Sequence, residues 1–303
     1  MNGKHFLSWL YSQPYLLLFL ATLFWAGNAI AGKLAVGHVS PFVLTSLRWL
    51  FASAIVIVVS LPQLKRDWQL IRPRLALLFS LGLIGFTLFN NLMYLALQST
   101  TAMNAAIIQA ALPASIFILN FLIYRLRANS HQLIGFPITV IGVTTIIAQG
   151  QWQVLTQLRF VVGDLLMLAA ITCYGVYSVM LSKKPKIHWL SLITVLAISA
   201  FLASVPFVFI EISHQKQLWP DQTGWALVLY TAVFASLCAQ VFWIRGLELI
   251  GSNAASLFIN LVPLLGTFLA ILLLGESLHW YHVCGLVLIV GGIMFAQRAE
   301  RVA

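Results

Sequence analysis

The chain has 303 residues, of which 61% are hydrophobic and only 8% are charged, and its mean hydropathy is +0.96. A soluble core of this length would need a charged, solvated surface, so the composition excludes a soluble globular protein and indicates a membrane protein. The net charge of +10 does not indicate nucleic-acid binding, because the basic residues lie in short loops between apolar runs.

A membrane-spanning helix needs about 20 mainly apolar residues, and ten such runs follow one another along the chain. The connections between them are short, and the longest, 62–73 and 211–222, are too small to fold alone. The predicted fold is therefore an all-α integral membrane protein with ten transmembrane helices. Their expected ranges are 14–32, 41–61, 74–96, 102–124, 131–149, 161–182, 188–210, 223–245, 252–274 and 280–298.

The Lys and Arg residues set the expected orientation of these spans. If the N-terminus is cytoplasmic, most of the 17 basic residues lie on that side, Lys33, Arg159 and Lys216 lie opposite, and Arg48 lies inside a span. We therefore expect a multi-pass protein of the cell (inner) membrane with both termini in the cytoplasm. The first span also resembles a signal peptide, with a small-x-small pattern at 29–31, but its match to the sixth span argues against cleavage.

The second half of the chain repeats the first at an offset of 150 residues. Each copy holds five predicted spans, an odd number, so the second copy should enter the membrane in the opposite sense. This predicts two inverted five-helix repeats, residues 1–150 and 151–303, with a substrate site near the midplane. Aligned pairs include Leu97 with Leu247, Ala105 with Ala255, Pro113 with Pro263, Gly135 with Gly285 and Gly142 with Gly292.

Several stretches resemble the drug/metabolite transporter superfamily, specifically its ten-helix EamA-type exporters. They are WAGNAIAGK at 25–33, P..LTSLRW at 41–49, Y.AL..TTAMNAAIIQAALP at 94–113, GDLLMLAAITCYGVYSV at 163–179 and GLELIGSNAASLFINLVPLLGTFLAILLLGESL at 246–278. The resemblance implies two EamA-like repeats and export of small metabolites, often amino acids. Family members often carry a Glu in the first copy where Glu276 stands in the second. Here that position is Leu126, so a first-half Glu role is not assumed.

Polar and aromatic side chains deep in the spans are the candidate substrate contacts. A polar group in the hydrocarbon region is costly, so it faces either a cavity or another helix. Asn90 and Gln240 occupy equivalent positions of the two copies and place an amide at the same depth. Each candidate either ties two helices together or contacts the solute. The candidates are Trp25, Asn28, Asn90, Tyr94, Gln109, Tyr174, Tyr177, Gln240, Trp243 and Asn260.

Pro113 and Pro263 lie in the middle of spans at matched positions. A proline lacks the amide hydrogen, so each frees a carbonyl four residues earlier, on Gln109 and Ile259. Matched helix breaks in two repeats point to a transporter site. The alternative is a kink that only shapes the packing.

Three charged residues, Lys33, Arg48 and Glu276, are candidates for gating or charge recognition. Arg48 is the only charge well inside a span, and it either snorkels outward, pairs with carbonyls or Glu276, or binds a carboxylate. Lys33, at the outer end of the first span, acts as a gate or anion contact, or else is an interfacial lysine. No acid or histidine lies at the midplane, so transport either runs down the substrate gradient or couples through a group at a span end.

The sequence thus predicts an exporter of small neutral or zwitterionic metabolites, above all amino acids, that works by alternating access. The alternative is a carrier for another solute on the same fold, a drug, a lipid or a nucleotide sugar. An enzyme is not expected, because GxSxG, HExxH and a buried His–acid pair are missing. No metal site and no cofactor are expected. The expected partners are a small-molecule substrate and the lipid bilayer, with no nucleic acid, and the chain is expected to be monomeric.

Overall fold

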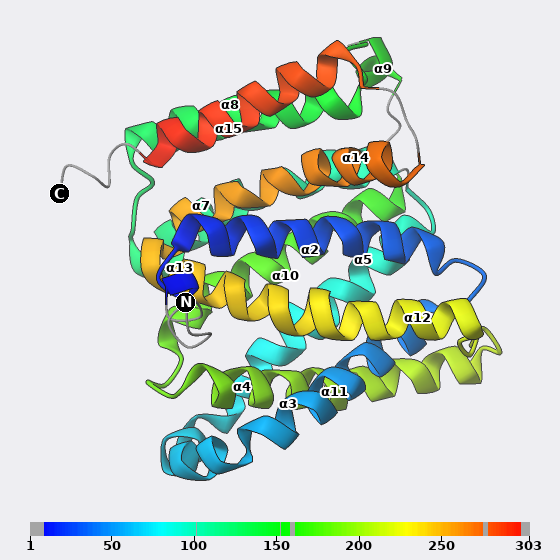
Figure 1. Ribbon diagram of the computed structural model, residues 1–303, viewed down its shortest axis with the longest axis vertical. Coiled ribbons are helices and arrows are strands. Elements are labelled where there is room, and N and C mark those ends of the chain that lie inside the picture. The colour runs from blue at the N-terminus through cyan, green and yellow to red at the C-terminus, as the bar shows by residue number, and fades with distance from the viewer. Residues whose placement is uncertain (1–8, 101, 152, 158–160, 275–277, 298–303) are drawn as a thin grey trace.

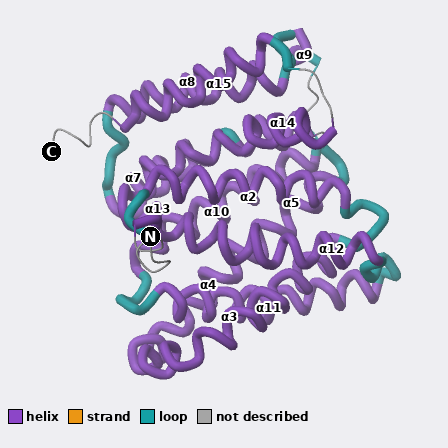
Figure 2. Tube along the Cα trace, viewed as in Figure 1, coloured by secondary structure: helices purple, strands orange, loops and turns teal. Residues whose placement is uncertain are grey.

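The computed structural model describes residues 9–100, 102–151, 153–157, 161–274 and 278–297. Every regular element in these ranges is helical (Figures 1 and 2). In chain order the elements are α2 (Pro14–Leu34), α3 (Pro41–Ile71), η1 (Arg72–Arg74), α4 (Leu75–Gly82), η2 (Leu83–Leu88), α5 (Phe89–Leu97), α6 (Ala102–Gln109), α7 (Leu112–Tyr124), α8 (Ser130–Ile147), α9 (Gln153–Thr156), α10 (Val162–Met180), η3 (Leu181–Lys183), α11 (Trp189–Ser213), α12 (Gln222–Tyr230), η4 (Thr231–Cys238), α13 (Ala239–Ser256), η5 (Leu257–Asn260), α14 (Leu261–Leu274) and α15 (Trp280–Gln297).

Eight helical stretches in the described ranges are long and apolar enough to cross a membrane. Two of them, Pro41–Leu97 with 57 residues and Gln222–Leu269 with 48, are far longer than the roughly 20 residues that one crossing needs. The count of ten spans therefore stays a prediction, because it requires each long stretch to hold two spans.

The predicted loop at 62–73 was wrong, because α3 continues to Ile71 and η1 joins it directly to α4. Apart from Pro62, residues 61–71 are mostly good helix formers. The charged residues in this range indicate where the helix leaves the membrane. They do not show that the helix ends there. Similarly, α13 continues beyond residue 245, with non-helical backbone only at Gly251.

The segments η2 and η4 are π-helical and interrupt the α-helical backbone. At the sequence offset of 150, η2 falls on the last six residues of η4, so both halves carry the irregularity at the same place. Such segments are rare and concentrate at functional sites. Here each one directly precedes the helix that carries a candidate amide, Asn90 on α5 or Gln240 on α13.

The helices pack as two outer pairs around a central group (Figure 1). The pair α8–α15 lies at one edge and the pair α3–α11 at the other. Between them, α2 packs against α13 and α14, and α10 packs against α5 and α7. The sequence offset aligns α2 with α10, α5 with α13 and α7 with α14. The contact of α2 with α13 therefore corresponds to the contact of α10 with α5, and the contact of α2 with α14 corresponds to that of α10 with α7.

Glycines bring α8 and α15 into close contact. A Cβ atom built on Gly135 would lie 2.6 Å from the carbonyl oxygen of Gly292, and one built on Gly142 would lie 3.0 Å from that of Gly285. Since the earlier residue of α8 meets the later residue of α15, the two helices run antiparallel. Small residues of this kind let membrane helices approach until their backbones touch.

The pair α3–α11 is fastened at both ends. At one end the carboxylate of Glu211 accepts hydrogen bonds from the backbone N–H groups of Phe42, at 3.0 Å, and Val43, at 3.3 Å. It thereby satisfies amide hydrogens that the first turn of α3 leaves free. At the other end the Asp67 carboxylate accepts a hydrogen bond of 3.0 Å from the backbone N–H of His188, beside the start of α11.

Candidate functional site

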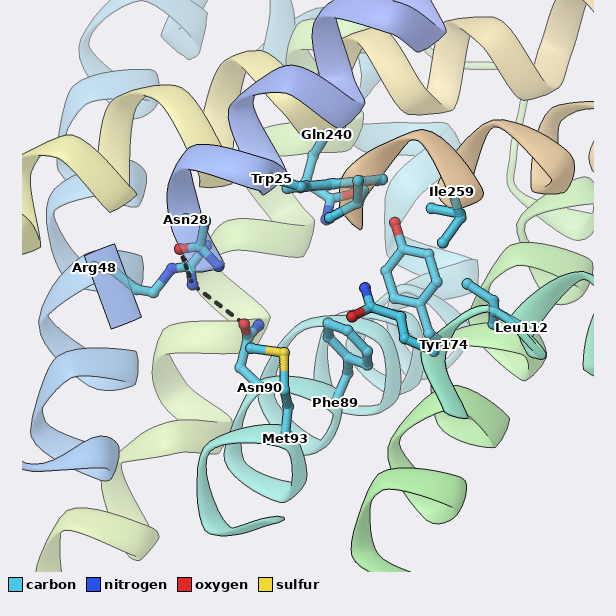
Figure 3. Close-up of a pocket in the computed structure, with 12 residues that line it drawn as sticks. Trp25, Asn28, Arg48, Phe89, Asn90, Met93, Leu112, Tyr174, Gln240 and Ile259 are labelled. Atoms are coloured by element: carbon cyan, nitrogen blue, oxygen red, sulfur yellow. Dashed lines mark hydrogen bonds between the residues drawn. The ribbon is translucent and has the colours of Figure 1, made fainter. Parts of the chain in front are cut away.

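A cavity of about 60 Å³ lies among the central helices (Figure 3). It is far smaller than the roughly 300–1,000 Å³ of sites that enclose drug-sized ligands. Its lining comes from α2, α3, α5, α6, α7, α10, α13, α14 and η5. The predicted site residues that line it are Trp25, Asn28, Arg48, Asn90, Gln109, Tyr174 and Gln240.

Arg48 is the charged residue of this lining, and its side chain turns inward. Only 2% of the residue is exposed, so it does not snorkel to the membrane surface. Nε donates to Oγ of Ser236 at 2.8 Å. Nη1 lies within hydrogen-bond distance of the Oδ1 atoms of Asn28, at 3.4 Å, and Asn90, at 3.2 Å, and of the Tyr94 hydroxyl, at 3.1 Å. The guanidinium thus connects α3 to α2, α5 and η4.

All these partners of Arg48 are uncharged. No described aspartate or glutamate forms an ion pair with its guanidinium. Glu276, one of the partners considered from the sequence, lies outside the described residues. So does the side chain of Lys33, whose backbone belongs to α2. The cavity wall therefore presents a buried positive charge held by amide and hydroxyl groups.

The backbone of η2 orients the Asn90 amide. Nδ2 of Asn90 donates to the carbonyl oxygen of Phe86, one turn earlier and within η2, which leaves Oδ1 to accept from Arg48. This arrangement fixes which end of the amide faces the guanidinium.

Aromatic rings form another wall of the cavity. Trp25 donates from Nε1 to the carbonyl oxygen of Ala235 at 3.2 Å, and its ring meets that of Tyr174 edge-on at 5.8 Å. Trp243 lies behind them, with its ring centroid 5.2 Å from that of Trp25. Tyr177 also lies behind the lining and donates its hydroxyl to Oε1 of Gln240 at 3.5 Å. These last two candidates support the wall and do not line the cavity.

Asn260 does not belong to the cavity. Its Nδ2 donates to Oγ1 of Thr139 at 2.7 Å, so it ties η5 to α8. Of the two readings that the sequence left open, this geometry is that of a tie between helices.

The matched prolines follow breaks in the α-helix beside the cavity. Pro113 is the second residue of α7, after a turn that separates α7 from α6, and Pro263 is the third residue of α14, after the 3₁₀ turn η5. The residues four positions earlier, Gln109 and Ile259, both line the cavity. Both helix breaks therefore lie beside the same cavity.

A second, wider cavity of about 480 Å³, which we name the vestibule, lies at one end of the helices. It is formed by the ends of α2, α3 and α5 and the loop before α12, with Gly32, Leu44, Tyr94, Gln98 and Lys216 among its lining residues. Tyr94 lines the vestibule and also contacts Arg48, which lines the central cavity. Tyr94 therefore lies between the two cavities.

Ion pairs join the helices at the opposite end. Glu248 accepts from Lys184 Nζ at 2.9 Å and from Arg245 Nη1 at 3.0 Å. Arg245 also donates from Nε to the backbone oxygen of Tyr11 at 3.1 Å and covers its ring at 4.6 Å. Burial, and then the nearby Glu248 carboxylate, raise the pKa of Tyr11 to about 12. The group ties α13 to the segments before α2 and before α11.

Sequence reasoning did not single out the apolar residues of the lining. Phe89 and Met93 line the cavity, but apolar residues in a membrane span carry no signal that separates lining from packing. Ser236, by contrast, is marked in the sequence as a deep polar residue, because it lies four residues before Gln240 and so on the same side of a helix.

The chain matches known transporters along most of its length. Residues 12–148 and 161–297 each match the EamA-like transporter family. The uncharacterized transporter YetK of Bacillus subtilis is 26% identical over 280 residues, which is 92% of this chain and 85% of the relative. A probable amino-acid metabolite efflux pump of Salmonella typhimurium is 26% identical over 308 residues, covering 95% of this chain and 96% of the relative.

Two further matches extend this picture. An S-adenosylmethionine/S-adenosylhomocysteine transporter of Chlamydia muridarum is 26% identical over 282 residues, covering 88% of this chain and 87% of the relative. A solved crystal structure superposes with a TM-score of 0.76 over 96% of this chain and 99% of its own, at 19% identity, and shows the fold alone. The family and these names indicate a transporter. The resemblance seen in the sequence is confirmed: the chain belongs to the EamA-like transporter family and is a multi-pass membrane transporter.

Proposed function

We propose that this transporter exports small neutral or zwitterionic metabolites, above all amino acids, across the cell (inner) membrane. The observation that carries the proposal is the central cavity, whose wall combines amides, aromatic rings and one buried guanidinium. Amides and a guanidinium suit the charged ends of a zwitterion, and aromatic rings suit an apolar side chain. The relative from Salmonella typhimurium, whose name refers to amino-acid metabolites, supports the same class.

We infer that the protein works by alternating access between two inverted repeats, residues 1–150 and 151–303, with ten spans. The exchanged helix contacts, the antiparallel pairs α3–α11 and α8–α15 and the matched π segments support this arrangement. The vestibule at one end and the Glu248 ion pairs at the other fit a state that is open toward a single side. The small volume of the central cavity implies that it widens when a solute enters.

The orientation follows from the charges. The Glu248 end holds Lys184 and Arg245, and we place it with both chain termini in the cytoplasm. The vestibule then faces outward. Because the described lining holds no carboxylate or histidine, we propose that transport runs down the substrate gradient.

A carrier for another solute class is the second candidate, favoured by the Chlamydia muridarum relative named for S-adenosylmethionine and S-adenosylhomocysteine. A nucleotide-sugar carrier is disfavoured, because a diphosphate calls for several cations and the described lining offers Arg48 alone. A drug or a lipid remains within this alternative.

The test is counterflow of labelled amino acids in proteoliposomes, with and without an imposed pH gradient. We expect at least one amino acid to exchange, and the exchange to be unaffected by the gradient. Gln240→Leu should abolish it, whereas Gln217→Leu, outside the lining, should not. A silent amino-acid panel with exchange of another solute would select the second candidate. Strict dependence on the pH gradient would refute the uncoupled mechanism.

A further inference from the structure

Arg48 combines burial, a positive charge and a place in the cavity wall. Its described hydrogen-bond partners are two amides and two hydroxyls, and none of its described bonds involves Nη2. A buried guanidinium without a counter-charge is costly in a membrane protein, so its retention calls for a negative group that joins it. The described residues supply no such group.

The geometry around Arg48 suits a bound carboxylate. Guanidinium and carboxylate are planar and form paired, charge-assisted hydrogen bonds. Asn28 and Asn90 turn their Oδ1 atoms toward Nη1, and the Asn90 amide is fixed from behind by the backbone of η2 (Figure 3). The side chain is therefore held in place before any ligand arrives, which lowers the ordering cost of binding.

The remainder of the lining suits the other parts of such a molecule. The Tyr174 hydroxyl is buried near the Gln240 amide and makes no hydrogen bond of good geometry to a described residue. Gln109 and Gln240 bring amide oxygens that can accept hydrogen bonds from an ammonium group, and Trp25 brings an aromatic face for a cation or an apolar side chain.

We propose that Arg48 binds the carboxylate of the transported solute, so that the protein selects carboxylate-bearing molecules over their amides and amines. This inference rests on the proposed function, because it assigns the recognition group of the same cavity. The competing view is that Arg48 only ties α3 to α2, α5 and η4. That view predicts a change in stability when Arg48 is replaced, but no change in ligand preference.

The first experiment uses the wild-type protein and varies the ligand. The melting temperature of purified protein in detergent is measured with the standard amino acids and small 2-oxo acids. For leucine and phenylalanine, the amides and the decarboxylated amines are added. We expect acids to raise the melting temperature at concentrations at least tenfold lower than their amides or amines. Equal effects of acids and amides, or no effect of any carboxylate, would overturn the proposal.

The second experiment varies the protein. Arg48→Gln should weaken acid binding at least tenfold and remove the preference for acids over amides, and Arg48→Lys should keep part of that preference. Arg127→Gln removes a positive charge at an exposed position beyond α7 and is the matched control, with wild-type binding expected. An Arg48→Gln protein that keeps the wild-type preference would overturn the proposal. If that variant does not fold, the ligand comparison on wild-type protein still decides.

The two readouts separate this inference from the proposed function. Acids that bind through Arg48 but do not exchange in proteoliposomes would refute transport of those acids and leave the carboxylate site intact. Exchange of amino acids and their amides at equal rates would support transport and reject the role of Arg48.

Discussion

The hydroxyl of Tyr94 lies 3.1 Å from Nη1 of Arg48, and the two residues line different cavities. The ring of Tyr94 is therefore part of the barrier between the vestibule and the central cavity. Its hydroxyl accepts a hydrogen bond from the buried guanidinium of Arg48, which holds the ring in this position.

Tyr94→Ala should open this barrier. In a background without the native cysteines, a cysteine at Asn28 should react several-fold faster with a charged thiol reagent applied from the vestibule side. Tyr94→Phe keeps the ring, so it should leave the labelling rate nearly unchanged. It should lower the free energy of unfolding by about 1 kcal/mol, because one hydrogen bond to a buried charge is lost. Equal labelling of the two variants would show that the ring is not the barrier.

Adjacent glycines of α15 offer a matched pair of substitutions. A Cβ on Gly292 would lie 2.8 Å from the carbonyl oxygen of Gly135, whereas a Cβ on Gly291 would meet nothing within 4 Å. Gly292→Ala should therefore destabilise the protein by about 1–3 kcal/mol through overpacking. Gly291→Ala should be neutral or slightly stabilising, since alanine favours the helix. Melting temperatures of the two variants in the same detergent decide, and an equal loss would contradict close packing of α8 on α15.

The sequence predicted some elements well because membrane spans depend on local composition. The described bounds of α8 and α10 lie within two residues of the expected spans. The amides of Asn90 and Gln240 were expected at one depth, and both line the same cavity. The repeat alignment made that possible, since equivalent positions of two similar halves lie at similar depths.

Other features depend on contacts that no local pattern records. The π segments η2 and η4 contain mostly apolar residues with no distinctive pattern, and only packing in the folded protein can select their hydrogen bonding. Trp243 and Tyr177 are aromatic like residues of the lining, but they pack against lining residues and do not reach the cavity. The ion pair of Glu248 joins it to Lys184 in a distant part of the chain, so no local pattern predicts it.

Glu248→Gln should weaken closure of its end of the protein, because both ion pairs of the carboxylate lose their charge attraction. We expect the free energy of unfolding to fall by about 1 kcal/mol, since these groups are partly exposed. A cysteine at the buried Ser178 should be labelled faster from the Glu248 end. Asp221→Asn, which removes the carboxylate that contacts His38 at the vestibule end, is the control and should not raise this labelling. Equal labelling rates in both variants would reject a role of Glu248 in closure.

Asp221 predicts a specific pH dependence. The backbone N–H of Gly224 and the His38 side chain, which lies 2.7 Å away, hold the pKa of Asp221 below its usual 3.8. A lowered folded-state pKa adds stability that is complete above pH 3.8 and is lost as the pH falls through the folded value. Wild type should therefore melt above Asp221→Asn at neutral pH, and the difference should vanish at strongly acidic pH. A difference that persists unchanged in acid would contradict this assignment.

The fastening of α3 to α11 has a mechanical consequence. With Glu211 holding one end of the pair and Asp67 the other, α3 and α11 form a rigid unit, and neither can slide past the other without losing these hydrogen bonds to carboxylates. Arg48 belongs to this unit. Any change in shape must then be taken up by the neighbouring helices, and η2 and η4 are where their hydrogen-bond ladder is already irregular. We expect the helices to bend at η2 and η4 while the Arg48 guanidinium stays in place. The other side chains that line the cavity would then move relative to it.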